Sequence, residues 1–558
     1  MTMETRLLIF FVLMGLVLVA TQYFYKPPPP PNKPAASNPA NTSAVKPVPV
    51  APVPAQPAPA PSPKAGAAPA DLPGRIQSDK EQQVTIETKP YKVVFSNRGA
   101  VVKSWILKAY KDRDGHPLDL VNTRALDKVP APFSLVVKAP LATDPNAALY
   151  TIDQPDPLTL NFEFSDGRAI TRKSFRFTAN SYLLAITSEV SQNGLLVPHQ
   201  LAWRGGFGDQ TVASATADEQ VVYYDTKLRQ QAAKEAKNGP VAFPGQYSFE
   251  GMDDKFFAGV FLPSGHAPSE VTVFADGVVN AAGAEEQRAG VAFGGEGVNI
   301  GSLFVGPKDT DLLRKIDPKL EGLIDWGWTE ILAKPLFLAL NWTNDHVVHN
   351  YGWAIVLLTV AINIVLSPLS LQSLKSSRKM QKIQPQITAL NAKYKGIKMN
   401  DPRKSEQNQE MMDLYKREGV NPMGGCLPML VQFPFLIAFY SVLRISIELR
   451  GANWLWVHDL SQPETIPIRI LPVVLIVTQF LTQRMTPTPG VDPSQQKMMM
   501  FTPLIFGYIF WFLSSGLVLY YLTSNAVAIA RQMILNRMSP MPAPAVVDVK
   551  PNSPKKRR

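Results

Sequence analysis

Residues 516–534 read GLVLYYLTSNAVAIARQMI, an apolar segment with polar side chains in its interior. Four similar segments precede it, at 353–371, 427–447, 468–483 and 498–513. The polar residues inside these five segments are Asn363, Gln432, Ser441, Arg444, Gln479, Thr482, Ser524, Asn525 and Arg531. Lipid tails cannot form hydrogen bonds, so such groups must face one another or a water-filled cavity. The pattern predicts a membrane-spanning helical bundle with a water-accessible interior. A protein of this kind transports or accepts polar groups.

Length and composition limit the classes of protein to consider. The chain has 558 residues, too many for a single core, so two or more domains are expected. Its one cysteine, Cys426, excludes an intrachain disulfide framework and a cysteine-rich zinc site. The closest histidines, His346 and His349, are a weak candidate for metal binding, and we expect no metal and no other cofactor.

The N-terminal 73 residues contain two segments of different composition. Residues 1–26 hold Arg6 and an apolar run that follows it, which indicates either a cleaved signal peptide or an uncleaved signal anchor. Leu18 fits a small–x–small cleavage site poorly, which favours the anchor. Residues 27–73 contain 17 prolines in 47 positions, typical of an extended linker rather than a folded domain. A peptide-recognition ligand is the alternative interpretation of this linker.

Residues 74–310 change to short alternating runs separated by turn residues. Strands are predicted at 84–86, 91–95, 101–107, 158–164, 182–190 and 271–274. Asp-Gly pairs at 114–115, 166–167 and 276–277 predict hairpin turns. This pattern predicts a large β-sandwich, in which no nucleophile–base pair or ligand cluster stands out. The segment WRGGF at 203–207 lines a groove or, as we favour, ends a strand with a turn.

Residues 311–350 return to helical periodicity. The segments 312–323 and 326–342 are predicted to form amphipathic helices. Tryptophan prefers the membrane–water interface, so we expect the second segment to lie along the membrane surface. A five-span core at 351–537 follows, and residues 538–558 form a basic tail.

The distribution of Lys and Arg predicts the topology. Residues 375–417 hold 11 basic and four acidic residues, which indicates a cytoplasmic loop. The tail is also basic, and the counts of charge in the other loops place the β-sandwich outside. Within 375–420, two amphipathic helices are predicted to form a hairpin. Its basic face contains Lys375, Arg378, Lys379 and Lys382. This face is suited to anionic lipid or to ribosomal RNA, although a solvated face that only enforces topology is the simpler alternative.

Several longer motifs occur in a fixed order. They are FVGPKD at 304–309, DWGW at 325–328, NPMGGCLP at 421–428 with QFP at 432–434, ELR at 448–450 with WVHDL at 456–460, and SGLVLYY at 515–521 with SN at 524–525. With these motifs the chain resembles the YidC/Oxa/Alb family of membrane insertases. The resemblance covers nearly everything except the Pro-rich linker and the tail.

The resemblance implies a polytopic α-helical bundle of six spans with a large periplasmic β-supersandwich domain, in a bacterial inner membrane. It implies a chaperone and insertase, not an enzyme, that inserts and folds nascent membrane proteins through a hydrophilic groove open to cytoplasm and lipid. The implied partners are nascent membrane proteins, the Sec translocon, a translating ribosome at the hairpin and tail, and membrane lipids. No small-molecule substrate is expected.

The groove residues depart from the family pattern at one position. The family usually places an arginine in the second span, where this chain has Asn363. Arg444 and Arg531 are the candidate replacements. Arg444 is predicted near the outer face, where pairing with Glu448 is the simpler explanation. Arg531 is predicted close to the depth of Asn363, which favours it, with a snorkelling cytoplasmic anchor as the alternative.

The resemblance also carries Thr359 and Tyr521 over as substrate-facing positions nearer the membrane centre. Gln432 and Ser524 are expected to line the wet part of the groove, and Pro434 to loosen its helix. The segments 468–483 and 498–513 are short for spans, which favours local thinning of the bilayer or helices hidden within a bundle.

Two other classes of protein are compatible with parts of the pattern. One is a membrane-anchored protein that binds or acts on carbohydrate with its outer β domain, since supersandwiches occur in sugar mutarotases. Such a protein would need only one membrane span as its anchor, so the five apolar segments of the C-terminal region argue against this class. The other is a small-solute transporter, which the large basic hairpin and the lack of an evident inverted repeat disfavour.

Overall fold

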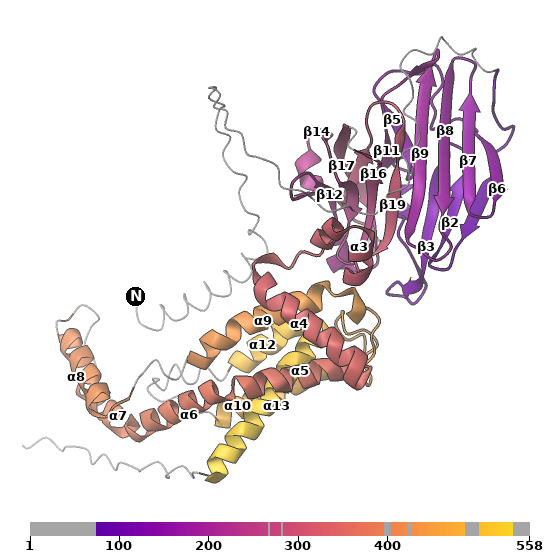
Figure 1. The fold of residues 1–558 in the computed structure, drawn as a ribbon. Coiled ribbons are helices and arrows are strands. Elements are labelled where there is room, and N and C mark those ends of the chain that lie inside the picture. The colour runs from indigo at the N-terminus through magenta and orange to yellow at the C-terminus, as the bar shows by residue number, and fades with distance from the viewer. Residues whose placement is uncertain are drawn as a thin grey trace, which may run out of the picture.

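A computed structural model describes residues 74–265, 268–280, 283–394, 401, 403–420, 427–485 and 501–538. The predicted signal anchor, the Pro-rich linker and almost all of the basic tail lie outside the described residues. So do residues 421–426, the first part of the NPMGGCLP motif. The described chain forms a strand-rich domain followed by a helical region (Figure 1).

Antiparallel strands build the first domain. The largest sheet contains, in spatial order, β13 (Leu228–Gln231), β12 (Gln220–Tyr224), β15 (Phe249–Asp253), β16 (Phe257–Pro263), β19 (Asn299–Pro307), β9 (Leu183–Gln192), β8 (Ala169–Phe177), β7 (Thr159–Ser165) and β6 (Thr151–Asp156), with β10 (Leu195–Leu196) beside β9. A second sheet contains β1 (Gln83–Glu87), β2 (Tyr91–Ser96), β3 (Val101–Lys111) and β4 (Pro117–Asp119). A third contains β14 (Val241–Gly245), β17 (Ser269–Val279), β18 (Glu285–Phe293), β11 (His199–Trp203) and β5 (Ser134–Val137).

An aromatic core holds the sheets together. Trp105 of β3 contacts Tyr91 of β2 and Trp203 of β11, with ring centroids 5.2 and 6.3 Å apart. Phe95 and Phe175 join the second sheet to the largest one, 4.9 Å apart. Alternating buried and exposed side chains along β8 follow from the two-residue period of a strand. The β-sandwich predicted from the sequence is therefore present.

Four of the six predicted strand runs fall within observed strands, and the runs at 158–164 and 182–190 begin one residue before β7 and β9. One predicted turn is wrong. The Asp-Gly pairs at 114–115 and 166–167 lie in turns, between β3 and β4 and between β7 and β8. Asp276 and Gly277 instead lie in the middle of β17, where they pair with Arg288 and Gln287. The buried carboxylate of Asp276 forms an ion pair with Arg204 and accepts the Gly205 amide at 2.8 Å, and these tertiary bonds hold it in the strand.

The WRGGF segment ends a strand. β11 stops at Trp203, and Gly205 and Gly206 then take positive φ angles of 79° and 98°. Trp203 and Phe207 are buried on either side of this turn. The favoured interpretation of the segment is confirmed.

Short helices link the sandwich to the helical region. They are α3 (Thr310–Ile316), capped by Asp309, then η3 (Pro318–Leu323), η4 (Gly327–Thr329), α4 (Glu330–Thr343) and the π-turn η5 (Asn344–Val348). One face of α4 is buried and carries Ala333, Leu336, Phe337 and Leu340. Its opposite face exposes Ile331, Leu338 and Trp342, as in a helix that lies along a membrane surface.

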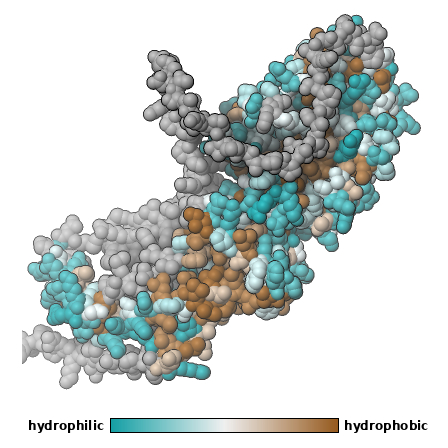
Figure 2. Space-filling model, viewed as in Figure 1, coloured by the Kyte–Doolittle hydropathy of each residue, from teal (hydrophilic) through white to brown (hydrophobic). Residues whose placement is uncertain are grey.

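The helical region consists of α5 (Tyr351–Val365), α9 (Leu427–Ile445), α10 (Ile470–Met485), α12 (Thr502–Trp511) and α13 (Ser515–Met538). α13 packs against α5, α9 and α10, while α12 packs against α10. Large apolar side chains of α10 and α12, such as Val477 and Tyr508, are exposed on the outside of the group. Hydrophobic residues accordingly gather over this region, below the more hydrophilic sandwich (Figure 2).

Judged by length and hydropathy, no individual helix of the described residues would cross a bilayer alone. Residues Glu330–Val348 and Tyr351–Val365 meet these criteria only as a pair, bent by 115°. The number of six spans therefore stays a prediction.

The loop between α5 and α9 forms the helices α6 (Ser367–Lys382), α7 (Gln384–Lys393) and α8 (Arg403–Arg417). The segment predicted as the first hairpin helix is thus divided at Ile383, because Pro385 starts a new helix. α7 packs against α8 through a small cluster that includes Ile383, Ile387 and Val420. Residues 395–400, where the pattern predicts the bend of the hairpin, lie outside the described residues.

Candidate substrate groove

Asn363 of α5 and Ser524 of α13 lie together between their helices. The Asn363 side-chain amide donates to the Thr359 carbonyl at 2.9 Å, and its nitrogen lies 3.4 Å from the Ser524 hydroxyl. Both residues are buried. A polar pair is therefore buried between two apolar helices, as expected for a bundle with a polar interior.

Arg531 lies on the same face of α13 as Ser524. Seven residues separate them, which is two helical turns, or about 10 Å along the axis. The guanidinium is half-buried, and its buried Nε has no hydrogen-bond partner among the described residues. A cation in this position is suited to binding an anionic group.

Gln432 of α9 lies opposite the same part of α13. The Phe439 ring stacks on Tyr520 of α13, with centroids 4.4 Å apart and an angle of 17°. Leu460 and Gln462, in the loop after α9, accept the amides of Gly516 and Ser515 at the start of α13, so the two helices are antiparallel. Gln432 precedes Phe439 by two turns and therefore lies level with the segment between Ser524 and Arg531.

Thr359 and Tyr521 are more enclosed than a surface for a sliding segment requires. Thr359 is fully buried, and its hydroxyl donates to the Ile355 carbonyl at 2.6 Å. The Tyr521 ring packs against Phe510 and Phe506 of α12, with centroids 5.0 and 6.4 Å away. In this conformation both residues belong to packed helix interfaces.

Arg444 does not pair with Glu448, so that prediction is wrong. Its Nη2 contacts both carboxylate oxygens of Asp218 in the sandwich, at 2.7 and 2.6 Å. The pair forms because the outer end of α9 lies beside the segment between β11 and β12. Burial raises the pKa of the Glu448 carboxyl to about 7, which is consistent with its having no cationic partner among the described residues.

A second polar stripe on α13 faces α10, and the sequence-based site did not include it. Asn525 donates to Gln479 of α10 at 2.9 Å, and Gln532 donates to the Met485 carbonyl at 3.2 Å. Asn525 and Gln532 are also seven residues apart, so the same spacing that relates Ser524 and Arg531 indicates this stripe. α13 therefore carries polar groups toward two neighbouring helices.

The basic face of α6 is divided. Lys375, Lys379 and Lys382 are exposed, whereas Arg378 turns toward α13 and donates to Asn536 at 2.9 Å. The exposed lysines form the part of this face that is open to a partner.

Both regions of the chain resemble known proteins. Residues 83–339 match the family model of the YidC periplasmic domain, and residues 342–542 match the model described as 60Kd inner membrane protein. The membrane protein insertase YidC of Ralstonia nicotianae is 34% identical over 490 residues, which cover 85% of this chain and 87% of the relative. The corresponding protein of Syntrophus aciditrophicus is 33% identical over 558 residues, covering 96% and 100%. The chain belongs to the YidC family of membrane protein insertases.

Membership of the YidC family gives the chain its function as a membrane protein insertase and its sandwich the identity of a YidC periplasmic domain. Solved structures that match the chain include an active YidC insertase, with a TM-score of 0.36, 19% identity, and coverage of 82% of this chain and 94% of that one. A galactose mutarotase-like protein from Lactobacillus casei has a TM-score of 0.30 and 9% identity, and covers 40% of this chain and 100% of its own. The carbohydrate alternative is not favoured, because the family matches extend through both regions.

Proposed function

We propose that the facing sides of α5, α9 and α13 form the hydrophilic groove that receives a nascent segment, and that Arg531 supplies its positive charge. The observation that carries this proposal is the buried Asn363–Ser524 pair. Arg531 lies two turns along the same face, and its Nε has no hydrogen-bond partner in the part of the chain that the structure describes. Arg444 is unsuited to the charge role because Asp218 already neutralises it.

The groove acts by lowering a solvation barrier, without a covalent step. A nascent apolar segment enters lipid favourably, but each unpaired polar group that crosses with it costs several kcal/mol. Asn363, Gln432 and Ser524 offer hydrogen bonds to such flanks, and Arg531 attracts an acidic one. The segment then moves toward the membrane centre, where opening of the Tyr521 and Thr359 interfaces gives it an apolar surface.

The proposed setting is a bacterial inner membrane with six spans and the periplasmic domain outside. The basic residues of α6 and of the tail support a cytoplasmic position for both. The exposed lysines of α6 are suited to anionic lipid and to a translating ribosome. Cooperation with the Sec translocon remains an expectation from the family resemblance.

The test replaces and then relocates the charge. Arg531→Gln is expected to reduce insertion of a substrate with an acidic translocated tail by about tenfold, the equivalent of about 1.4 kcal/mol. Asn363→Arg added to this variant should restore insertion, because it places a cation on α5, the helix that faces α13. Insertion is measured by protease protection of the tail in proteoliposomes.

Arg537→Gln is the matched control, since Arg537 lies on the same helix but is exposed. Arg537→Gln should insert the acidic-tail substrate as well as wild type does. Arg531→Gln should insert a substrate with a neutral tail as well as wild type does. The proposal would be overturned if Arg531→Gln inserted the acidic-tail substrate as well as wild type does.

A further inference from the structure

The outer end of α9 is attached to the periplasmic domain through two arginines. Arg444 lies in the last turn of α9, and Arg450 follows the short helix η7 (Ile447–Leu449). Their partners, Asp218 and Asp209, lie on either side of the short helix α2 (Ala213–Ala217) between β11 and β12. Segments more than two hundred residues apart in sequence are thus joined at two points.

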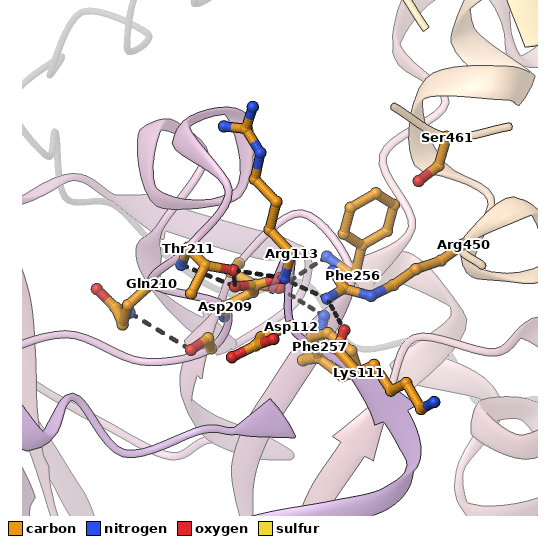
Figure 3. Close-up of polar contacts among 12 residues, drawn as sticks. Lys111, Asp112, Arg113, Asp209, Gln210, Thr211, Phe256, Phe257, Arg450 and Ser461 are labelled. Carbon is orange, nitrogen blue, oxygen red and sulfur yellow. Dashed lines mark hydrogen bonds and ion pairs between the residues drawn. The ribbon is translucent and has the colours of Figure 1, made fainter. Parts of the chain in front are cut away.

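The Arg450 contact is buried and continues into the domain (Figure 3). The Arg450 side chain is 6% exposed and that of Asp209 is 0% exposed. Arg450 Nη2 donates to Asp209 and to the Lys111 carbonyl, the latter at 2.8 Å. The guanidinium also lies over the rings of Phe256 and Phe257, at 5.3 and 5.2 Å.

Asp209 is itself held rigidly. Its Oδ1 accepts the Thr211 amide at 2.8 Å and the Thr211 hydroxyl at 2.6 Å. Its own amide donates to Asp254 at 2.9 Å, and Asp254 in turn accepts the amides of Phe256 and Phe257. The network therefore runs from Arg450 through Asp209 and Asp254 into the loop between β15 and β16.

The Arg444 contact is more open but has good geometry. One guanidinium nitrogen contacts both oxygens of Asp218, and the two side chains are 41% and 32% exposed. An exposed pair alone contributes little. Together with a buried pair six residues along the chain, it fixes the direction of the helix end as well as its position.

We propose that Arg444–Asp218 and Arg450–Asp209 form a two-point latch that makes α9 and the periplasmic domain move as one rigid body. α9 also carries Gln432 and Phe439, so the latch connects one wall of the proposed groove to the domain outside the membrane. The latch itself does not depend on the assignment of the groove and is tested without substrate.

The experiment measures the distance between two spin labels by double electron–electron resonance in the full chain. Cysteines replace Leu195, which is 74% exposed at the β10 hairpin, and Leu455, which is 62% exposed in the loop after α9, with Cys426→Ala as background. The unchanged latch should give a narrow distance distribution. Arg444→Asp is expected to broaden it at least twofold, and Arg444→Asp with Asp218→Arg should restore the narrow distribution.

Arg450→Gln provides a second measurement, because reversal of the buried Asp209 is liable to disturb folding of the domain. It should broaden the distribution further than Arg444→Asp. Arg172→Asp is the control, since it breaks an exposed ion pair with Glu163 inside the domain and should leave the distribution unchanged. Narrow distributions in both Arg444→Asp and Arg450→Gln would overturn the latch. So would failure of the charge exchange to restore the narrow distribution in a folded protein.

Discussion

At the scale of single residues, burial decides the properties of the charged groups in the sandwich. Glu250 of β15 is fully buried, and its Oε1 accepts the Ser269 hydroxyl at 2.6 Å, while Oε2 has no partner in the described part of the chain. Desolvation raises the pKa of this carboxyl to about 8. Lys173 shows the opposite effect, since complete burial lowers the pKa of its ammonium to about 7.

The raised pKa of Glu250 predicts a dependence of stability on pH. The folded state holds the Glu250 proton up to about pH 8, whereas the unfolded chain releases it near its ordinary value of 4.5. The contribution of Glu250 to stability is therefore fully present below pH 4.5 and declines as pH rises toward 8, by about 1.4 kcal/mol per unit. Glu250→Gln should raise the unfolding midpoint of the full chain in detergent at pH 8 by several degrees and have little effect at pH 4.5.

The matched control is Glu163→Gln, which changes a partly exposed carboxylate on the surface of the same sheet. It should not produce a pH-dependent gain. Equal midpoints for Glu250→Gln and wild type at both pH values would contradict the assignment of a protonated Glu250.

At the scale of elements, close approach between backbone and side chain fixes how the helices pack. Gly352 lies in the first turn of α5, where an added Cβ would lie 2.2 Å from atoms of the Trp454 indole. At Gly507 of α12, an added Cβ would also lie 2.2 Å from the Ile476 side chain of α10. These contacts explain why glycine occurs within otherwise large apolar helices.

Gly352→Ala is therefore expected to displace the Trp454 loop from α5. The cost of such overpacking is about 1–3 kcal/mol, enough to lower the unfolding midpoint of the helical region measurably. Gly322→Ala is the control, because no atom lies within 4 Å of the corresponding added Cβ. A Gly352→Ala protein as stable as Gly322→Ala would show that the loop adapts without cost.

At the scale of the whole molecule, the interface between α9 and the sandwich predicts different effects for two kinds of change. One removes only Asp209, the partner of Arg450, and the other removes most of the domain. Asp209→Ala in the intact chain leaves the Arg450 cation buried without its carboxylate, which costs about 3–5 kcal/mol. Deletion of residues 83–305 instead exposes Arg450 to water, where it is solvated. The single substitution should therefore impair the protein more than the removal of most of the domain.

This prediction is tested by the growth of cells in which the variant is the source of insertase activity. Immunoblots confirm that the variants are present in equal amounts. The deletion should support growth better than Asp209→Ala does. The reverse order would indicate that the sandwich has a direct part in insertion, beyond its attachment to α9.

From the sequence, six of the strands, most of the helices and the polar residues inside the apolar segments could be predicted, because strands and helices repeat with local periods of two and 3.6 residues. Asn363, Ser524 and Arg531 were predicted as groove residues because they are polar residues inside apolar segments, and the motifs indicated the family. The partner of Arg444, the strand position of Asp276 and the attachment of Arg450 became apparent only once the chain was seen in three dimensions. In each case the deciding bond joins residues far apart in the chain, 226 positions for Arg444 and Asp218, and no local pattern carries such information. These ion pairs depend on which charged groups the folded chain brings close together, and for Asp276 and Arg450 burial makes such a partner necessary.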